Sequence, residues 1–286
     1  MTSTDHVARH PTLDELVEDV ANLHPRAAVS VRVLAITEQD HFSAHELATV
    51  IASDPALTAK MLRLANSAYY GYARRINTAR DAVVLLGFRA VRSATLVSTV
   101  IDAVKGEGVI DREAFWRYSV AVGMLAEVLA RAQRHHQHHA FTAGVLHNLG
   151  RLALDQQAPE ALGEAIGLSQ RLDIPLREAQ SVLLGFTEVD LGSALAERWN
   201  FPEALVEAIR HWADETPPAG SLAATVGSAC AFAQAQGLPD GVAPGAVGEP
   251  SDEWLTPALA SSLDQLGGVS GVFARAEAFV ESTLLH

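Results

Sequence analysis

Histidine and carboxylate side chains can hold a metal ion, and His147, Glu188 and His211 are residues of these types. Imidazole nitrogens and carboxylate oxygens bind divalent transition metals, and a bound metal can activate water for hydrolysis. Asn148 follows His147 directly, but its amide oxygen is neutral, so it neither balances the charge of a metal nor acts as a general base. We therefore expect a metal-free polar cluster held by hydrogen bonds, with a single-metal site as the alternative.

Composition argues against several other classes of function. The sequence contains no GxxxxGK[ST] loop, no CxxC pair and no GxSxG motif, so P-loop nucleotide hydrolysis, thiol redox chemistry and serine hydrolysis are not indicated. Cys230 is the only cysteine, which excludes an intramolecular disulfide. We expect no apolar run of membrane-spanning length, and residues 1–11 are too polar for a secretory signal. The prediction is a cytoplasmic protein without membrane association and without a cofactor.

Charge is distributed unevenly along the chain. The formal net charge of −13 disfavours sequence-independent nucleic-acid binding, which needs an excess of basic residues facing phosphates. The segment 60–92, however, contains seven basic residues and one acidic residue, Asp81. Ordinary solvation of helix faces is one explanation of this segment. The other is a basic surface for an acidic partner, formed by Arg74, Arg75, Arg89 and Arg92.

The elements that must position these side chains are all helices. Helical periodicity recurs, and no segment keeps the alternation typical of a strand, so the predicted fold class is all-α. Capping-box spacing marks helix starts at Thr12 and Ser43, and Pro55 fits the first position of another helix. The same kinds of signal predict further helices over 78–86, 88–104 and 141–154, from Asp111, and from near Pro175, Glu188 and Pro202. Apolar faces predict the burial of Leu57, Leu62, Leu64, Leu85, Leu86 and Trp116.

Asn66 and Ser67 follow the helix that begins at Pro55. Short polar side chains compete for helical backbone hydrogen bonds, so we expect both to bond to backbone groups and to fix a turn. Tyr69 and Gly71 complete this turn, Tyr69 as an aromatic anchor. A structural role, rather than contact with a substrate, is predicted for these residues.

Three segments together closely resemble the bacterial HDOD domain, an all-helical relative of the HD metal-phosphohydrolases. They are DPALTAKMLRLANSAYYG, INTARDAVVLLGFRAVR and AGVLHNLG, and the resemblance extends over about residues 23–212. It implies an N-terminal helical bundle over 1–108 and a degenerate HD-like helical core over 109–215. Residues 216–286 are then a C-terminal helical extension packed on that core.

The resemblance also assigns positions to the ligands of a metal centre, and several of them are replaced. Asn148 stands where the HD motif has aspartate. Tyr118 and Glu188 stand where relatives commonly have histidine. Trp212 replaces the second histidine of a pair that begins at His211. Because tyrosine is a protonated phenol at neutral pH and a poor ligand for such metals, HD-type hydrolysis is not expected.

The resemblance implies a non-catalytic signalling module that acts through protein–protein contacts, with an output in stress response, motility or cyclic-nucleotide signalling. The partner is expected to be a signalling protein bound in trans. Two alternatives stay open. One is a divergent metal-dependent phosphohydrolase or nucleotide-binding sensor that uses His147, Glu188 and His211. The other is a nucleic-acid-associated regulator that uses the basic surface.

Overall fold

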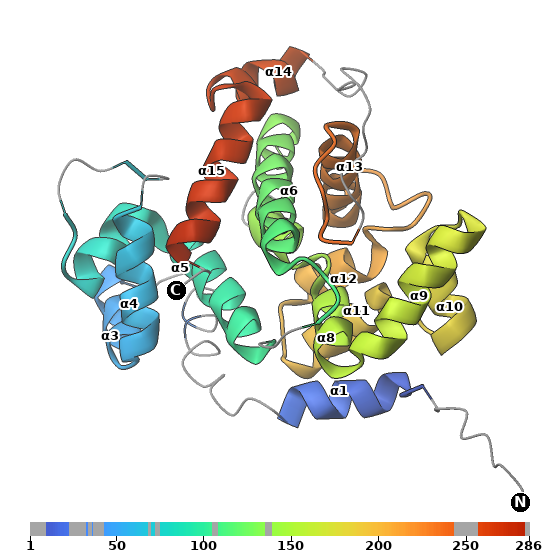
Figure 1. The fold of residues 1–286 in the computed structure, drawn as a ribbon. Coiled ribbons are helices and arrows are strands. Elements are labelled where there is room, and N and C mark those ends of the chain that lie inside the picture. The colour runs from blue at the N-terminus through green and yellow to red at the C-terminus, as the bar shows by residue number, and fades with distance from the viewer. Residues whose placement is uncertain are drawn as a thin grey trace, which may run out of the picture.

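The computed structural model describes residues 10–22, 33, 36, 43–67, 70–71, 75–104, 108–134, 139–242 and 257–283. Within these residues the regular structure is entirely helical, so the predicted all-α class is confirmed. Several helices pack around a central one, α6 (Figure 1). The helices are α1 (Leu13–Asn22), α3 (Ala44–Ala52), α4 (Pro55–Ala65), α5 (Ala79–Ala103), α6 (Arg112–Gln133), α7 (Ala140–Leu146), α8 (Leu149–Gln157), α9 (Pro159–Leu172), α10 (Leu176–Leu184), α11 (Glu188–Arg198), α12 (Glu203–His211), α13 (Leu222–Ala235), α14 (Pro257–Asp264) and α15 (Gly268–Thr283).

The helices α3, α4 and α5 form a small bundle at one side of the molecule (Figure 1). Their starts follow the capping signals of the sequence. The Ser43 hydroxyl accepts a hydrogen bond from the Glu46 amide at 3.1 Å, and the Asp54 carboxylate accepts one from the Ala56 amide at 2.9 Å. Gly87 interrupts α5 with a φ of 76°, a left-handed conformation that glycine adopts without steric cost. The predicted helix stop at Gly87 is therefore present.

The predicted core residues are buried with two exceptions. The buried ones are Leu57, Leu64, Leu86 and Trp116. Leu62 and Leu85 are only half-buried and pack against the core from its edge, so the prediction of their burial is wrong. Leu62 lies about 100° around α4 from the buried Met61, because one residue advances a helix by that angle. Leu85 likewise lies between the exposed Val84 and the buried face of α5.

One stretch of α5, Ala79–Val100, is long and apolar enough to cross a membrane, so the expectation that no run reaches this length is wrong. Its packing is that of a core helix in a soluble protein. About half of its most apolar window, 56%, is buried inside the molecule, and the helix contacts α3, α4 and α7. The break at Gly87 also divides the stretch into two shorter segments.

Glycines let two pairs of helices near His147 approach closely. The pairs are α6 with α7, and α8 with α11. A Cβ on Gly144 would lie 2.6 Å from the Cα of Gly123, and a Cβ on Gly150 would lie 1.8 Å from the backbone oxygen of Glu188. No larger residue fits either position without a backbone shift, so these glycines fix the spacing of the helices around His147.

The first helix lies differently from the predicted division of the chain, whereas the last helices pack on α6 of the predicted core. The predicted capping box at Thr12 is present, with the Glu15 carboxylate accepting from the Thr12 amide at 2.8 Å. However, α1 buries Leu16 and Val20 against α8 and α11, not against α3–α5, so a bundle over 1–108 does not include the first helix (Figure 1). At the other end, α14 and α15 pack on α6, and α15 also contacts α4. The C-terminal helix α15 thus connects α6 to the α3–α5 bundle.

Candidate functional site

His147 and Asn148 lie at a break between α7 and α8, where the sequence predicts one continuous helix over 141–154. His147 ends α7, and Asn148 precedes α8 with φ −101° and ψ 23°, outside helical values. The prediction of a single helix is therefore wrong. Asparagine favours helix ends over helix interiors, which explains the position of the break. Both side chains are buried, His147 at 1% and Asn148 at 2% exposure.

The His147 ring is held by one hydrogen bond and two aromatic neighbours. Its Nδ1 lies 2.5 Å from the Gly144 carbonyl oxygen, which only accepts, so Nδ1 donates and Nε2 carries the lone pair. The Trp212 ring packs edge-on at a centroid distance of 4.8 Å, and the Tyr118 ring lies at 5.9 Å. Burial lowers the pKa of His147 to about 4, and the Arg151 cation acts in the same direction. The imidazole is therefore neutral at neutral pH.

Both oxygens of the Glu188 carboxylate are engaged by a buried guanidinium. Arg151 Nε and Nη2 donate to them at 2.9 and 2.7 Å. Gln180 donates to the same carboxylate at 3.0 Å and accepts from the Glu188 backbone amide at 2.9 Å. Burial alone raises the pKa of Glu188, but the Arg151 charge outweighs it, so this pKa lies below its ordinary value. Glu188 is thus an ionised counter-ion rather than an available metal ligand.

Arg151 is the residue of this site that the sequence analysis missed. Its Nη1 donates to the Asp240 carboxylate at 2.7 Å, so one buried cation joins α8, α11 and the segment after α13. Burial alone lowers the pKa of Arg151, but pairing with two carboxylates raises it above its usual range. A signal was available in the sequence. Arg151 is the only charged residue in the run 149–154, and a buried charge requires a counter-ion.

His211 does not join His147 and Glu188. It ends α12 with its side chain 37% exposed, and its Nδ1 lies 2.9 Å from the Asp214 carboxylate. Across the described ranges, no three His, Cys, Asp or Glu side chains are arranged to hold a metal ion. The prediction that His211 shares one polar cluster with His147 and Glu188 is therefore wrong. The reason is that His211 faces solvent, while the next residue, Trp212, is buried beside His147.

Tyr118, Asn148 and Trp212 complete a polar cluster around His147. The Tyr118 hydroxyl lies 3.4 Å from the Cys230 carbonyl oxygen, and burial raises the pKa of Tyr118, so the phenol stays protonated. His147 Nε2, Asn148 Oδ1 and Trp212 Nε1 are buried and have no hydrogen-bond partner among the described residues. The cluster thus presents two neutral acceptors and one donor. These groups include no carboxylate that could bridge metal ions, and the lowered pKa makes the His147 nitrogen a weak base.

The turn after α4 is held by side chains that bond to backbone groups. Asn66 Nδ2 donates to the carbonyl oxygens of Leu62 at 2.7 Å and Ile76 at 2.8 Å, and Asn66 Oδ1 accepts from the Ile76 amide at 2.8 Å. Ser67 Oγ donates to a carbonyl of α4 at 2.7 Å, and Gly71 has a φ of 60°. These are the backbone bonds expected of the two polar residues. Tyr69 lies outside the described residues.

The predicted basic surface is described only in part. Arg75 and Arg89 are exposed, Arg92 is half-buried, and Arg74 lies outside the described residues. Within the same segment, Lys60 is partly withdrawn from solvent, because its Nζ donates to the Ser98 hydroxyl at 2.7 Å. Arg75 and Arg89 therefore remain the described positions through which this surface could meet a partner.

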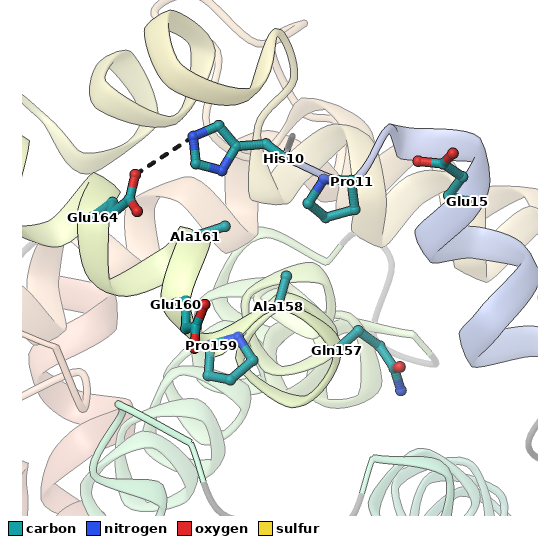
Figure 2. A pocket seen from close by; sticks show the side chains of 9 residues that line it. All are labelled: His10, Pro11, Glu15, Gln157, Ala158, Pro159, Glu160, Ala161 and Glu164. Atoms are coloured by element: carbon teal, nitrogen blue, oxygen red, sulfur yellow. Dashed lines mark ion pairs between the residues drawn. The ribbon is translucent and has the colours of Figure 1, made fainter. Parts of the chain in front are cut away.

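A pocket of about 550 Å³ lies between the segment before α1 and the junction of α8 with α9 (Figure 2). It shares no lining residue with the His147 cluster. Pro11 and Pro159 contribute apolar walls, Glu15 and Glu160 contribute carboxylates, and His10 Nε2 lies 3.4 Å from Glu164 at one side. The lining groups include neither a nucleophile paired with a base nor a set of metal ligands, so the pocket is not a candidate active site.

Comparison with known proteins identifies relatives for this architecture. A family model for the HDOD domain matches residues 23–214. The structure of an HDOD domain protein with unknown function from Geobacter sulfurreducens has a TM-score of 0.73 and 23% sequence identity, covering 96% of this chain and 98% of that one. A protein from Shewanella amazonensis SB2B, provisionally named a phosphohydrolase, has a TM-score of 0.70 and 23% identity, with coverage of 94% and 98%.

Two further relatives differ in length from this chain. A protein from Marinobacter aquaeolei VT8, provisionally named a signal transduction protein, has a TM-score of 0.69 and 24% identity, covering 96% of this chain and 61% of its own. An uncharacterized protein of Treponema pallidum (strain Nichols) is 26% identical over 201 residues, which are 70% of this chain. The match spans only 38% of that curated relative.

Proposed function

Because the chain belongs to the HDOD domain family, we propose that it is a non-enzymatic signalling protein of the cytoplasm that acts through contacts with a partner protein. The buried Arg151–Glu188 ion pair is the observation that carries this proposal. In this pair the carboxylate of Glu188, the one carboxylate among the three candidate metal ligands, is bound by a cation of the chain itself. The likeness to a protein provisionally named for signal transduction lends further support.

The absence of hydrolysis follows from the requirements of a metal centre. Such a centre needs anionic ligands that balance the metal charge and an open position for a water of lowered pKa. Asn148 is neutral, Glu188 is paired with Arg151, and His211 pairs with Asp214 at the surface. In this cluster His147 Nε2 is the one nitrogen that can bind a metal, and one neutral nitrogen beside the neutral Asn148 oxygen does not hold a catalytic metal.

The test measures hydrolysis by the wild-type protein and by the variants Asn148→Asp and His147→Ala in the presence of Mg²⁺, Mn²⁺ or Zn²⁺. The substrates are cyclic dinucleotides, nucleoside phosphates and a chromogenic phosphodiester. We expect no turnover by the wild type, and none by Asn148→Asp, because the other replaced ligands remain absent. Metal-dependent turnover by the wild type that vanishes in His147→Ala would show that the protein is an enzyme.

Partner binding through the basic surface is the second half of the proposal. Exposed positive charge on an acidic protein steers association with an acidic surface. In a pull-down analysed by mass spectrometry, the variant Arg75→Glu/Arg89→Glu should lose the specific partner while keeping its melting temperature. Arg171→Glu, an exposed charge reversal at the end of α9, serves as the matched control. The resemblance suggests stress response, motility or cyclic-nucleotide signalling as the pathway, and the identity of the captured protein decides among them.

A further inference from the structure

A short segment after α13 lies against both the start of α6 and the buried cation Arg151. We call this segment, residues 237–241, the strap. The Asp240 carboxylate accepts a hydrogen bond from Arg151 Nη1 at 2.7 Å, and the Gly241 carbonyl oxygen accepts one from the Asp111 amide at 2.9 Å. The strap is thus joined to α8 through a charged side chain and to the start of α6 through its backbone.

The strap lies at the surface of the molecule. Four of its residues are half-buried and Pro239 is exposed, and Leu238 packs against the core only from its edge. The Asp240 side chain is 20% exposed, whereas that of Arg151 is 7% exposed. Segments that bury little apolar surface open at a lower free energy than the core around them. The strap therefore meets the physical requirement for local opening.

A glycine in a left-handed conformation stands at each end of the strap. Gly237 has a φ of 75° and Gly241 has a φ of 88°. Glycine adopts such values, and many others, without the steric cost that a side chain brings, so both residues can act as hinges. A Cβ on Gly241 would lie 2.6 Å from the Asp111 carbonyl oxygen, so only glycine lets the closed strap approach α6 this closely.

The charges beneath the strap stay balanced when Asp240 leaves. Arg151 directs Nε and Nη2 to the Glu188 carboxylate and Nη1 to that of Asp240. Without Asp240, one cation and one carboxylate remain paired, so opening leaves no uncompensated charge in the interior. The Asp240 carboxylate, already exposed in part, regains water at the same time. Of these two carboxylates on Arg151, Asp240 is thus the one that can leave.

We propose that the strap opens locally about Gly237 and Gly241 in the folded protein, and that the ion pair of Asp240 with Arg151 holds it closed. Opening breaks this ion pair and the hydrogen bond from the Asp111 amide, while the helices keep their packing. It exposes Arg151 Nη1, so the strap is a switch that covers or presents one cationic donor. Neither state requires a partner protein, so this motion is expected whether or not the proposed function holds.

Amide hydrogen exchange resolved by NMR reports on the strap directly, because the Asp111 amide is bonded to Gly241 only when the strap is closed. Exchange through local opening depends little on low denaturant concentrations, whereas exchange through global unfolding shows the full dependence. In the wild-type protein the Asp111 amide should therefore exchange at a rate nearly independent of denaturant. The amide of the buried Leu125, in the middle of α6, should show the full dependence.

The variant Asp240→Asn tests the ion pair, because it removes the charge and keeps the shape of the side chain. It should raise the exchange rate of the Asp111 amide by about tenfold or more. The Val109 amide, which bonds to Asp155 in the same loop, should keep its rate. Glu178→Gln, the loss of one exposed carboxylate on α10, is the matched control and should leave the Asp111 amide unchanged.

Three results would overturn the proposal. The first is the same denaturant dependence for the amides of Asp111 and Leu125, because the strap would then open only when the protein unfolds. The second is an unchanged Asp111 rate in Asp240→Asn, which would show that the ion pair does not hold the strap. The third is an equal rise at Val109, which would assign the effect to the whole loop before α6. The wild-type measurement needs no variant, so it decides local opening even if Asp240→Asn is unstable.

Discussion

Replacing Arg151 by methionine should destabilise the protein by about 3–5 kcal/mol, the cost of leaving one member of a buried ion pair without its partner. The structure supports this range. Arg151 donates two hydrogen bonds to Glu188, whose side chain is 2% exposed, so the carboxylate cannot regain water in place of the guanidinium. Asp240 adds little to the cost, because its side chain is 20% exposed and can be rehydrated. Methionine keeps much of the length of arginine, so the loss of packing is small.

Urea unfolding followed by circular dichroism measures the loss of stability in Arg151→Met. Its dependence on pH shows whether the unpaired Glu188 carboxylate causes it. Without Arg151, burial is no longer outweighed and the pKa of Glu188 rises, because Gln180 alone does not compensate a buried charge. The destabilisation should therefore be smaller at pH 5 than at pH 7, since the carboxyl group is protonated more readily at the lower pH. The double variant Arg151→Met/Glu188→Gln should recover most of the loss. A loss below about 1 kcal/mol, or a double variant no more stable than the single one, would refute the assignment of Arg151 as the essential counter-ion.

Three further perturbations test other parts of the structure. The pKa of His147 is about 4 in the folded protein, whereas an unperturbed histidine, as in the unfolded chain, has a pKa of 6.5. Between these two values the unfolded chain binds a proton that the folded protein does not. About 3 kcal/mol of stability should therefore be lost as the pH falls from 6.5 to 4. His147→Phe should flatten that dependence in chemical-denaturation curves, and an unchanged slope would contradict it. Asn66→Ala removes three hydrogen bonds to backbone groups and should lower the melting temperature in calorimetry, at a cost of about 1–3 kcal/mol. Asp155 is fully buried and accepts hydrogen bonds from the Val109 and Ile110 amides. Asp155→Ala should therefore lower the free energy of unfolding in urea by about 3 kcal/mol or more. An unchanged free energy would show that the loop before α6 is held by other contacts.

Local signals in the sequence predicted the elements well, whereas the placement of side chains in the site depended on contacts distant in sequence. The caps at Thr12, Ser43 and Asp54 follow from residues three or fewer positions away, so sequence alone predicts them. His211 and Trp212 are neighbours in sequence, and only the direction of the C-terminal end of α12 decides which one is buried. Asparagine favours helix ends, but the apolar pattern over 141–154 continues on both sides of Asn148, so the pattern alone predicted one helix where the structure has a break.

The Arg151–Glu188 ion pair occupies the carboxylate that a metal centre at this place would need. A metal centre joins helices by giving their anionic and polar side chains one shared cation. Here the Arg151 guanidinium has that role: it links α8 to Glu188 of α11 and to Asp240 after α13, while Gln180 of α10 supports the same carboxylate. Aspartate at position 148 would add a third negative charge near Arg151, whose guanidinium already pairs with the carboxylates of Glu188 and Asp240. Such a charge would have to be neutralised by protonation or by local opening of the core, since His147 is itself neutral and His211 faces solvent. We therefore expect Asn148→Asp to yield a less stable protein rather than a hydrolase.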